Sequence, residues 1–348
     1  IVFLCLLLIG NEMDPLSQGT VGAAFAQSIA NKNNIIKIGI IGFLAGLAPD
    51  LDVLIRSEND PILFLEYHRQ FSHSLFFIPY GSLIVALLIF PLFKKSMGFK
   101  TIYMASFLGY ATHGLLDACT SYGTLLFWPF SNERITWNNI SIIDPLFTIP
   151  VLILIGIAIK TRKRIFSFFA IGWIIFYLSL GFIQYDRALS AAIKLAESRG
   201  HVAERITLKP SFGNLILWKS IYQYEETFYV DAIRTVKSTT WCKGETTKVF
   251  DYQHHLPNLD KDSQQRKDIE RFRWFSQDYL GYNKEKNLVT DIRYSMIPNQ
   301  IAPMWGLVID DKRGINEHAI WWTNRDFDQS QIDLFKDMLS GKKCRKFK

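Results

Sequence analysis

Six residues that can bind a metal ion interrupt three apolar stretches between positions 47 and 117 of the sequence. They are Asp50, Asp52, His68, His73, His113 and Asp117. A carboxylate surrounded by apolar groups is unfavourable by several kcal/mol unless it is paired, neutralised or bound to a cation. Because one shared cation explains all three stretches, the sequence predicts a metal site built from them.

The spacing within two of these stretches supports a metal site. His113 and Asp117 are four residues apart, on one face of a helix, where they either bind one cation or hydrogen-bond to each other. Pro49 lacks an N–H, so the helix is expected to break there and turn Asp50 and Asp52 inward. One of the two is expected to cap the next short helix. We assign Asp50 as the metal ligand, and Asp52 as the base or as a residue that orients a ligand.

The histidine pair needs a different local structure. His68 and His73 are five residues apart and would point to different sides of a continuous helix. A helix that begins at Ser72 would leave His68 in the preceding loop and let both side chains converge. Arg69 lies between them and either holds an anionic group of a substrate, such as a phosphate, or lies at the surface near the lipid headgroups.

The helices that must position these residues resemble membrane spans. Five apolar stretches are close to the roughly 20 residues that a bilayer requires. They cover residues 35–55, 75–93, 101–119, 142–159 and 165–183. The connections on one side carry nine lysines and arginines and those on the other side carry three, which places the richer side in the cytoplasm. In this topology all six candidate residues lie toward the extracytoplasmic face.

Charged residues divide the chain into two parts. The first 184 residues hold 12 Lys and Arg and 10 Asp and Glu, against 27 and 22 in the last 164. We therefore predict a transmembrane helical domain at 13–184 and a water-soluble domain at 185–348. Residues 1–12 are interpreted as upstream sequence or a signal-like remnant before a natural start at Met13. The net charge of +7 suits an anionic partner such as lipid headgroups, or reflects a solvated basic face.

Alternating apolar and β-branched residues characterise the second half. Runs at 205–208, 214–222, 226–233, 291–295, 304–309 and 318–323 predict half-buried strands, after a short helix at 188–199 and before a helix at 329–339. The predicted fold class is α+β: a multi-pass transmembrane α-helical half followed by a mainly β extracytoplasmic domain. Among the four cysteines, Cys242 and Cys344 are the pair open to a disulfide bond in an oxidising compartment.

Motifs in a fixed order carry a resemblance to a known family. They are the segments 13–18, 49–52, 68–74 and 113–124. Together they resemble the bacterial, LexA-regulated type of membrane-bound metal-dependent hydrolase, which implies an enzyme of the inner membrane with an unspecified substrate. Many members carry a histidine where this chain has Gln18. A more distant likeness to zinc-dependent phospholipase C and P1-type nucleases implies phosphoester or lipid-linked substrates.

The main hypothesis is a membrane-bound hydrolase that uses Zn²⁺, or Mn²⁺ as second choice, because imidazoles and carboxylates suit both ions. The cation would lower the pKa of a bound water that attacks the substrate. The expected ligands are Asp50, His68, His73, His113 and Asp117, and the expected catalytic residues are Asp52 and Arg69. An ion- or proton-coupled transporter and a non-catalytic scaffold are the alternatives. The bilayer and an anionic or lipid-linked substrate are the expected partners, and no motif indicates nucleic-acid binding.

Overall fold

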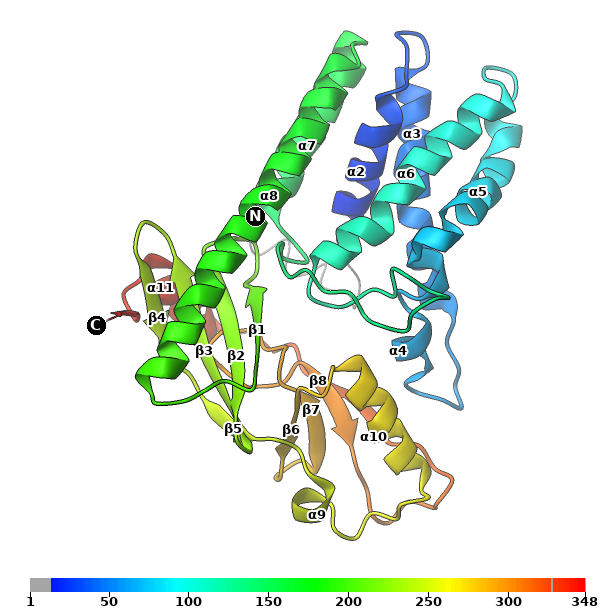
Figure 1. Ribbon diagram of the computed structural model, residues 1–348. Coiled ribbons are helices and arrows are strands. Elements are labelled where there is room, and N and C mark those ends of the chain that lie inside the picture. Colours follow the sequence, from blue (N-terminus) through cyan, green and yellow to red (C-terminus); the bar gives the residue numbers. More distant parts are fainter. Residues whose placement is uncertain (1–13, 327, 348) are drawn as a thin grey trace. The chain divides into compact units, whose positions relative to one another are not determined.

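A computed structural model describes residues 14–326 and 328–347, so the interpretation of residues 1–12 and Met13 lies outside the described residues. The fold is α+β, with helices in the first half and antiparallel sheets in the second (Figure 1). The chain forms two compact units. The first contains residues 14–54, 67–182 and 212–214, and the second contains 55–66, 183–211 and the rest of the described chain.

Long apolar helices build the first unit. They are α2 (Pro15–Gln27), α3 (Ile35–Leu47), α5 (Ile78–Phe93), α6 (Phe99–Cys119), α7 (Pro145–Thr161) and the start of α8 (Ile165–Ser198). Short turns connect α3 to α5: η1 (Ala48–Leu54), α4 (Leu63–Tyr67), η2 (Phe71–His73) and η3 (Leu75–Phe77). As expected, α3 ends just before Pro49, and the following 3-10 turn carries both Asp50 and Asp52.

Glycines bring the backbones of α2, α3 and α6 into direct contact, which we call the glycine seam. A Cβ at Gly22 would lie 2.5 Å from the carbonyl oxygen of Gly42, and a Cβ at Gly109 would overlap that same oxygen. Small residues at such positions let membrane helices approach closely. Gly42 and Gly46 are four residues apart on α3, as Gly109 and His113 are on α6. The glycine seam therefore places Gly46 of α3 beside His113 of α6.

The helices differ in whether they are long and apolar enough to cross a membrane. In the described part of the chain, residues 75–93 and 165–198 form helices long and apolar enough to cross a membrane, and α7 is apolar but shorter. Residues 188–198 are helical as predicted, but they do not form a separate helix, because α8 continues without a break through that region. Residues 184–187 contain no glycine or proline to end the helix, and Ala188, Ala192 and Leu195 pack in the core of the second unit.

The second unit contains antiparallel sheets. The first sheet has the order β1 (Arg205–Pro210), β2 (Leu217–Tyr224), β3 (Thr227–Thr235), β4 (Thr239–Cys242) and β10 (Arg345–Lys346), with β5 (Thr246–Lys248) paired to β3. The second has the order β6 (Leu280–Asn283), β7 (Leu288–Asp291), β8 (Trp305–Val308) and β9 (Ile320–Thr323). The helices are α9 (Tyr252–His255), α10 (Gln264–Phe275) and α11 (Gln329–Ser340).

One strand expected in this unit is absent. The strand expected at 291–295 is wrong, because β7 already ends at Asp291. The backbone N–H and the guanidinium of Arg293 both donate to the Asp291 carboxylate, which bends the chain and buries the ion pair. Cys242 and Cys344, expected as a possible pair, are joined by a disulfide bond.

Candidate metal centre

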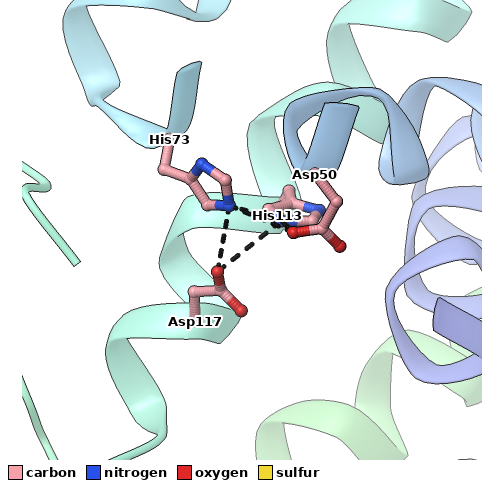
Figure 2. A group of neighbouring side chains, drawn as sticks. All are labelled: Asp50, His73, His113 and Asp117. Carbon is pink, nitrogen blue, oxygen red and sulfur yellow. Dashed lines mark hydrogen bonds and ion pairs between the residues drawn. The ribbon is translucent and has the colours of Figure 1, made fainter. Parts of the chain in front are cut away.

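Side chains from distant parts of the first unit meet at one buried point. One donor atom from each of Asp50, His73, His113 and Asp117 lies within 4.8 Å of the other three (Figure 2). Asp50 comes from η1, His73 from η2, and the other two from the last turns of α6. His73, His113 and Asp117 are at most 2% exposed. This group could hold a metal ion.

The donor separations fit a small cation. The Nε2 atoms of His73 and His113 are 2.9 Å apart, and they lie 3.4 and 3.3 Å from Oδ1 of Asp50. Oδ2 of Asp117 lies 3.2 and 3.6 Å from the same two nitrogens. Ligands about 2.0–2.2 Å from one metal ion lie about 3.0–3.6 Å from one another in tetrahedral or octahedral geometry. All five separations are close to that range.

Hydrogen bonds on the far side of each imidazole leave both Nε2 atoms without a proton in the neutral rings. Nδ1 of His113 lies 2.5 Å from the carbonyl oxygen of Gly46, which can only accept. Nδ1 of His73 lies 3.1 Å from the carboxylate of Asp52. In the neutral rings the two Nε2 lone pairs would face each other at 2.9 Å, and they would repel unless a positive charge lay between or beside them. A cation removes that repulsion, and the outer hydrogen bonds then orient its ligands.

Three carboxylate oxygens of the group also lack a hydrogen-bond donor within the described part of the chain. Among the described residues, no donor reaches either oxygen of Asp50 or Oδ2 of Asp117 with hydrogen-bond geometry, although these atoms are buried. Buried carboxylate oxygens are normally satisfied, and one without a donor requires a specific explanation. A metal ion bound to Asp50 and Asp117 supplies one.

Asp52 lies beside the group and uses its carboxylate as an acceptor. It receives hydrogen bonds from Nδ1 of His68 (2.8 Å), the backbone N–H of Arg69 (3.0 Å) and the hydroxyl of Ser72 (2.7 Å). Together with its contact to His73, these bonds hold the 68–73 segment in place. The arrangement corresponds to the orienting role considered for Asp52.

His68 lies outside the four-residue group but next to it. Its Nδ1 faces Asp52, and its buried Nε2 has no hydrogen-bond partner in the described part of the chain. Burial lowers the pKa of His68 below its usual value, against the opposing effect of the Asp52 carboxylate. Burial therefore favours the neutral ring.

Arg69 is buried against the site instead of lying at the surface. Its Nε lies 3.1 Å from Oδ2 of Asp117, and its Nη1 donates to the hydroxyl of Thr120. Its guanidinium carbon lies 4.7 Å from the centre of the Tyr122 ring. Arg69 thus places a positive charge beside one of the candidate ligands.

Sequence reasoning missed the groups that support the centre from outside. The carbonyl of Gly46 and the hydroxyl of Ser72 belong to residue types that carry no signal of their own. The amide of Gln18 donates to Oδ1 of Asp117 at 2.8 Å, so the first helix does reach the site. The four-residue glycine spacing on α3 and α6 was the available clue to the position of Gly46.

The apolar helices and the buried His and Asp group define a class: a membrane protein with a polar centre that could hold a metal ion. A sequence model of the family described as YdjM inner membrane protein matches residues 13–188, about half of the chain. The chain belongs to this family, in agreement with the resemblance to the LexA-regulated inner-membrane type. No curated protein and no solved structure matches the chain.

Proposed function

We propose that this chain is a multi-pass inner-membrane hydrolase that binds a divalent metal ion at the extracytoplasmic ends of its helices. The observation that carries the proposal is the pair of Nε2 atoms of His73 and His113, 2.9 Å apart and flanked by the carboxylates of Asp50 and Asp117. Zn²⁺, with Mn²⁺ as second choice, suits this mixture of imidazoles and carboxylates. When bound, it would supply Lewis acidity and lower the pKa of a coordinated water.

The residues around the metal would have separate roles in orienting its ligands and attracting the substrate. Asp52 orients His73 and His68 through hydrogen bonds to their Nδ1 atoms. His68 lies outside the four-residue group, and its unpartnered Nε2 is a further donor beside it. Arg69 balances the charge of Asp117 and is positioned to attract an anionic group of the substrate. A phosphoester or lipid-linked substrate fits this combination.

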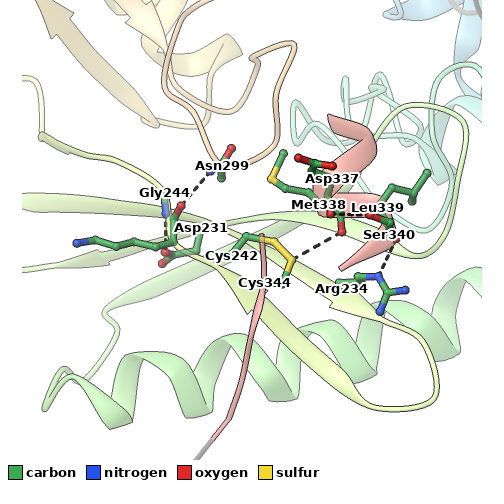
Figure 3. The surroundings of a disulfide bond; sticks show 11 residues. Asp231, Arg234, Cys242, Gly244, Asn299, Asp337, Met338, Leu339, Ser340 and Cys344 are labelled. Carbon is green, nitrogen blue, oxygen red and sulfur yellow. Dashed lines mark hydrogen bonds between the residues drawn. A yellow bond between two sulfur atoms is a disulfide. The ribbon is translucent and has the colours of Figure 1, made fainter. Parts of the chain in front are cut away.

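Charge and cysteine chemistry support an extracytoplasmic second unit. The connections between the expected spans carry nine basic residues on one side and three on the other. The Cys242–Cys344 disulfide joins β4 to the residue before β10 (Figure 3). Disulfides persist in oxidising compartments and are rare in the cytosol. Both observations favour the outside of the inner membrane for residues 185–348.

A reporter fusion tests this topology. Alkaline phosphatase fused after Lys348 is expected to be active, because that enzyme needs an oxidising compartment to form its own disulfides. A green fluorescent protein fusion at the same position serves as the reciprocal control and is expected to be dark after export. An inactive alkaline phosphatase fusion together with a fluorescent green fluorescent protein fusion would place the C-terminus in the cytoplasm. That result would contradict the placement of both the second unit and the metal centre.

Hydrolysis of a phosphodiester tests the proposed activity. The purified full chain is expected to bind zinc and to cleave a chromogenic phosphodiester or a phospholipid in mixed micelles. Removal of the metal with a chelator should abolish cleavage, and added Zn²⁺ or Mn²⁺ should restore it. A chain that binds metal but cleaves neither substrate class would contradict a phosphoesterase and favour an ion-binding membrane protein.

A further inference from the structure

Two buried lysines lie opposite each other on neighbouring strands of the first sheet. Lys209 of β1 and Lys219 of β2 are partners in the antiparallel register, so their side chains leave the same face of the sheet. They are 6% and 4% exposed. Lysine is almost never buried unless it is paired, and like charges directly opposite each other destabilise a sheet. This pair of lysines therefore requires a specific explanation.

Alternation along the two strands determines which part of the second unit covers the lysines. Leu208 and Trp218 precede them in sequence and pack on one face of the sheet, in a cluster with residues of α8. Lys209 and Lys219 therefore point to the opposite face. There, residues 293–300 supply their contacts. All of these residues belong to the second unit.

The contacts of the two ammonium groups are with neutral partners. Nζ of Lys219 donates to the hydroxyl of Ser295 at 2.7 Å and to the carbonyl oxygen of Gln300 at 2.6 Å. Nζ of Lys209 lies 3.3 Å from the centre of the Tyr294 ring and has no hydrogen-bond partner among the described residues. The face of the ring attracts a cation, but it supplies none of the oxygen acceptors that an ammonium group normally finds.

The buried charges around the two lysines do not balance. The carboxylate of Asp291 accepts hydrogen bonds from Nε and Nη2 of Arg293, so these two residues neutralise each other. Burial lowers the pKa of Lys209 well below its usual value, and the charge of Arg293 lowers it further. Burial also lowers the pKa of Lys219 to about 7, against the opposing effects of Glu245 and Asp291. Protonation of both lysines therefore requires an additional negative charge.

We propose that Lys209 and Lys219 form a binding site for the phosphate group of a small water-soluble molecule. Phosphate carries about two negative charges at neutral pH, which match two ammonium groups. Its oxygens also supply the acceptors that Nζ of Lys209 lacks within the described chain. β1 is the edge strand of the first sheet, so the site lies at the border of the sheet and not at its centre (Figure 1).

The depth of the two lysines decides between the sources of such a group. Because both side chains are buried, a small phosphate compound fits the site better than the headgroup of a lipid that stays in the bilayer. The site consists of residues of the second unit alone, so it does not depend on the proposed metal centre.

Calorimetric titration of the purified full chain with inorganic phosphate, in a phosphate-free buffer, tests the proposal. The original chain is expected to bind phosphate. Lys209→Met is expected to bind it about 10–100-fold more weakly, because the variant loses a hydrogen bond to a charged group. Methionine has a similar length and no charge, and replacement of a buried charge by an apolar residue is often tolerated. Lys219→Met provides a second variant with the same expected loss.

Lys248→Met is the matched control, because Lys248 is an exposed lysine on β5 of the same sheet. It is expected to bind phosphate like the original chain. An original chain that binds no phosphate would overturn the proposal. Undiminished binding by Lys209→Met and Lys219→Met would also overturn it, since phosphate held elsewhere, for example at Arg69, would persist in both variants. Binding of phosphatidic acid in mixed micelles without binding of inorganic phosphate would overturn a site for a small molecule.

Discussion

Replacement of His113 by alanine is expected to abolish metal binding by the purified protein. His113 lies in the middle of the group: its Nε2 is within 3.6 Å of donors from His73, Asp50 and Asp117. Alanine removes this nitrogen, so the cation would lose one of its four candidate ligands. We expect a loss of affinity beyond about 100-fold, the upper end for residues that only support ligands. Elemental analysis and metal titration of both proteins measure it.

Gln18→Ala is the control variant for the effect of His113→Ala on metal binding. Gln18 touches Asp117 through a hydrogen bond and is as deeply buried as His113. Its removal is expected to weaken binding by about 10–100-fold while leaving measurable metal. Gln18→His should bind metal as well as the original chain or more tightly, since imidazole is the better zinc ligand. Equal losses in Gln18→Ala and His113→Ala would show that the first helix supplies a primary ligand.

Gly114→Ala is expected to damage both the fold and the centre. A Cβ at this position of α6 would overlap the backbone carbonyl oxygen of His73. The clash is with backbone, so rotation of a side chain cannot relieve it, and η2 must move away from α6. Overpacking of this kind destabilises by about 1–3 kcal/mol. Moving η2 also separates His73 from His113, so metal binding should fall together with the melting temperature.

A glycine in open surroundings provides the control for this substitution. Gly156 lies inside α7, and a Cβ there would meet no atom of the described residues within 4 Å. Gly156→Ala should leave metal binding unchanged and keep or raise the melting temperature, because alanine favours a helix by up to about 1 kcal/mol over glycine. Similar losses in Gly114→Ala and Gly156→Ala would contradict a specific contact between α6 and His73.

Much of the candidate site was visible in the sequence because polar groups in apolar stretches need a common explanation. Asp50, His73, His113 and Asp117 were all named on that ground, and the structure brings these four together. The position of His68 outside the group of four was not predicted. The Nδ1 atom of His68 engages Asp52, and this choice depends on where the η1 turn lies after folding. Periodicity and spacing carry no information about such contacts between turns.

The fold shows the same division between local and distant causes. The proline identified the end of α3, and the alternation identified three strands of the first sheet, β1, β2 and β3; both signals depend on neighbouring residues. The continuity of α8 was missed because its charged residues near 184–187 suggested a boundary, whereas packing of Ala188 and Leu195 keeps the helix intact. The edge contact of Phe64 with Trp321 joins residues far apart along the chain, beyond the range of a local pattern.

The glycine seam also limits how the centre can move. Side chains can change rotamer when neighbouring helices slide, but Gly22, Gly42 and Gly109 have none, so α2, α3 and α6 are expected to behave as one block. Asp50 and His73 instead lie on 3-10 turns, which hold few backbone hydrogen bonds. The position of these two side chains therefore depends on side-chain contacts, such as the hydrogen bonds that Asp52 accepts from Arg69 and Ser72.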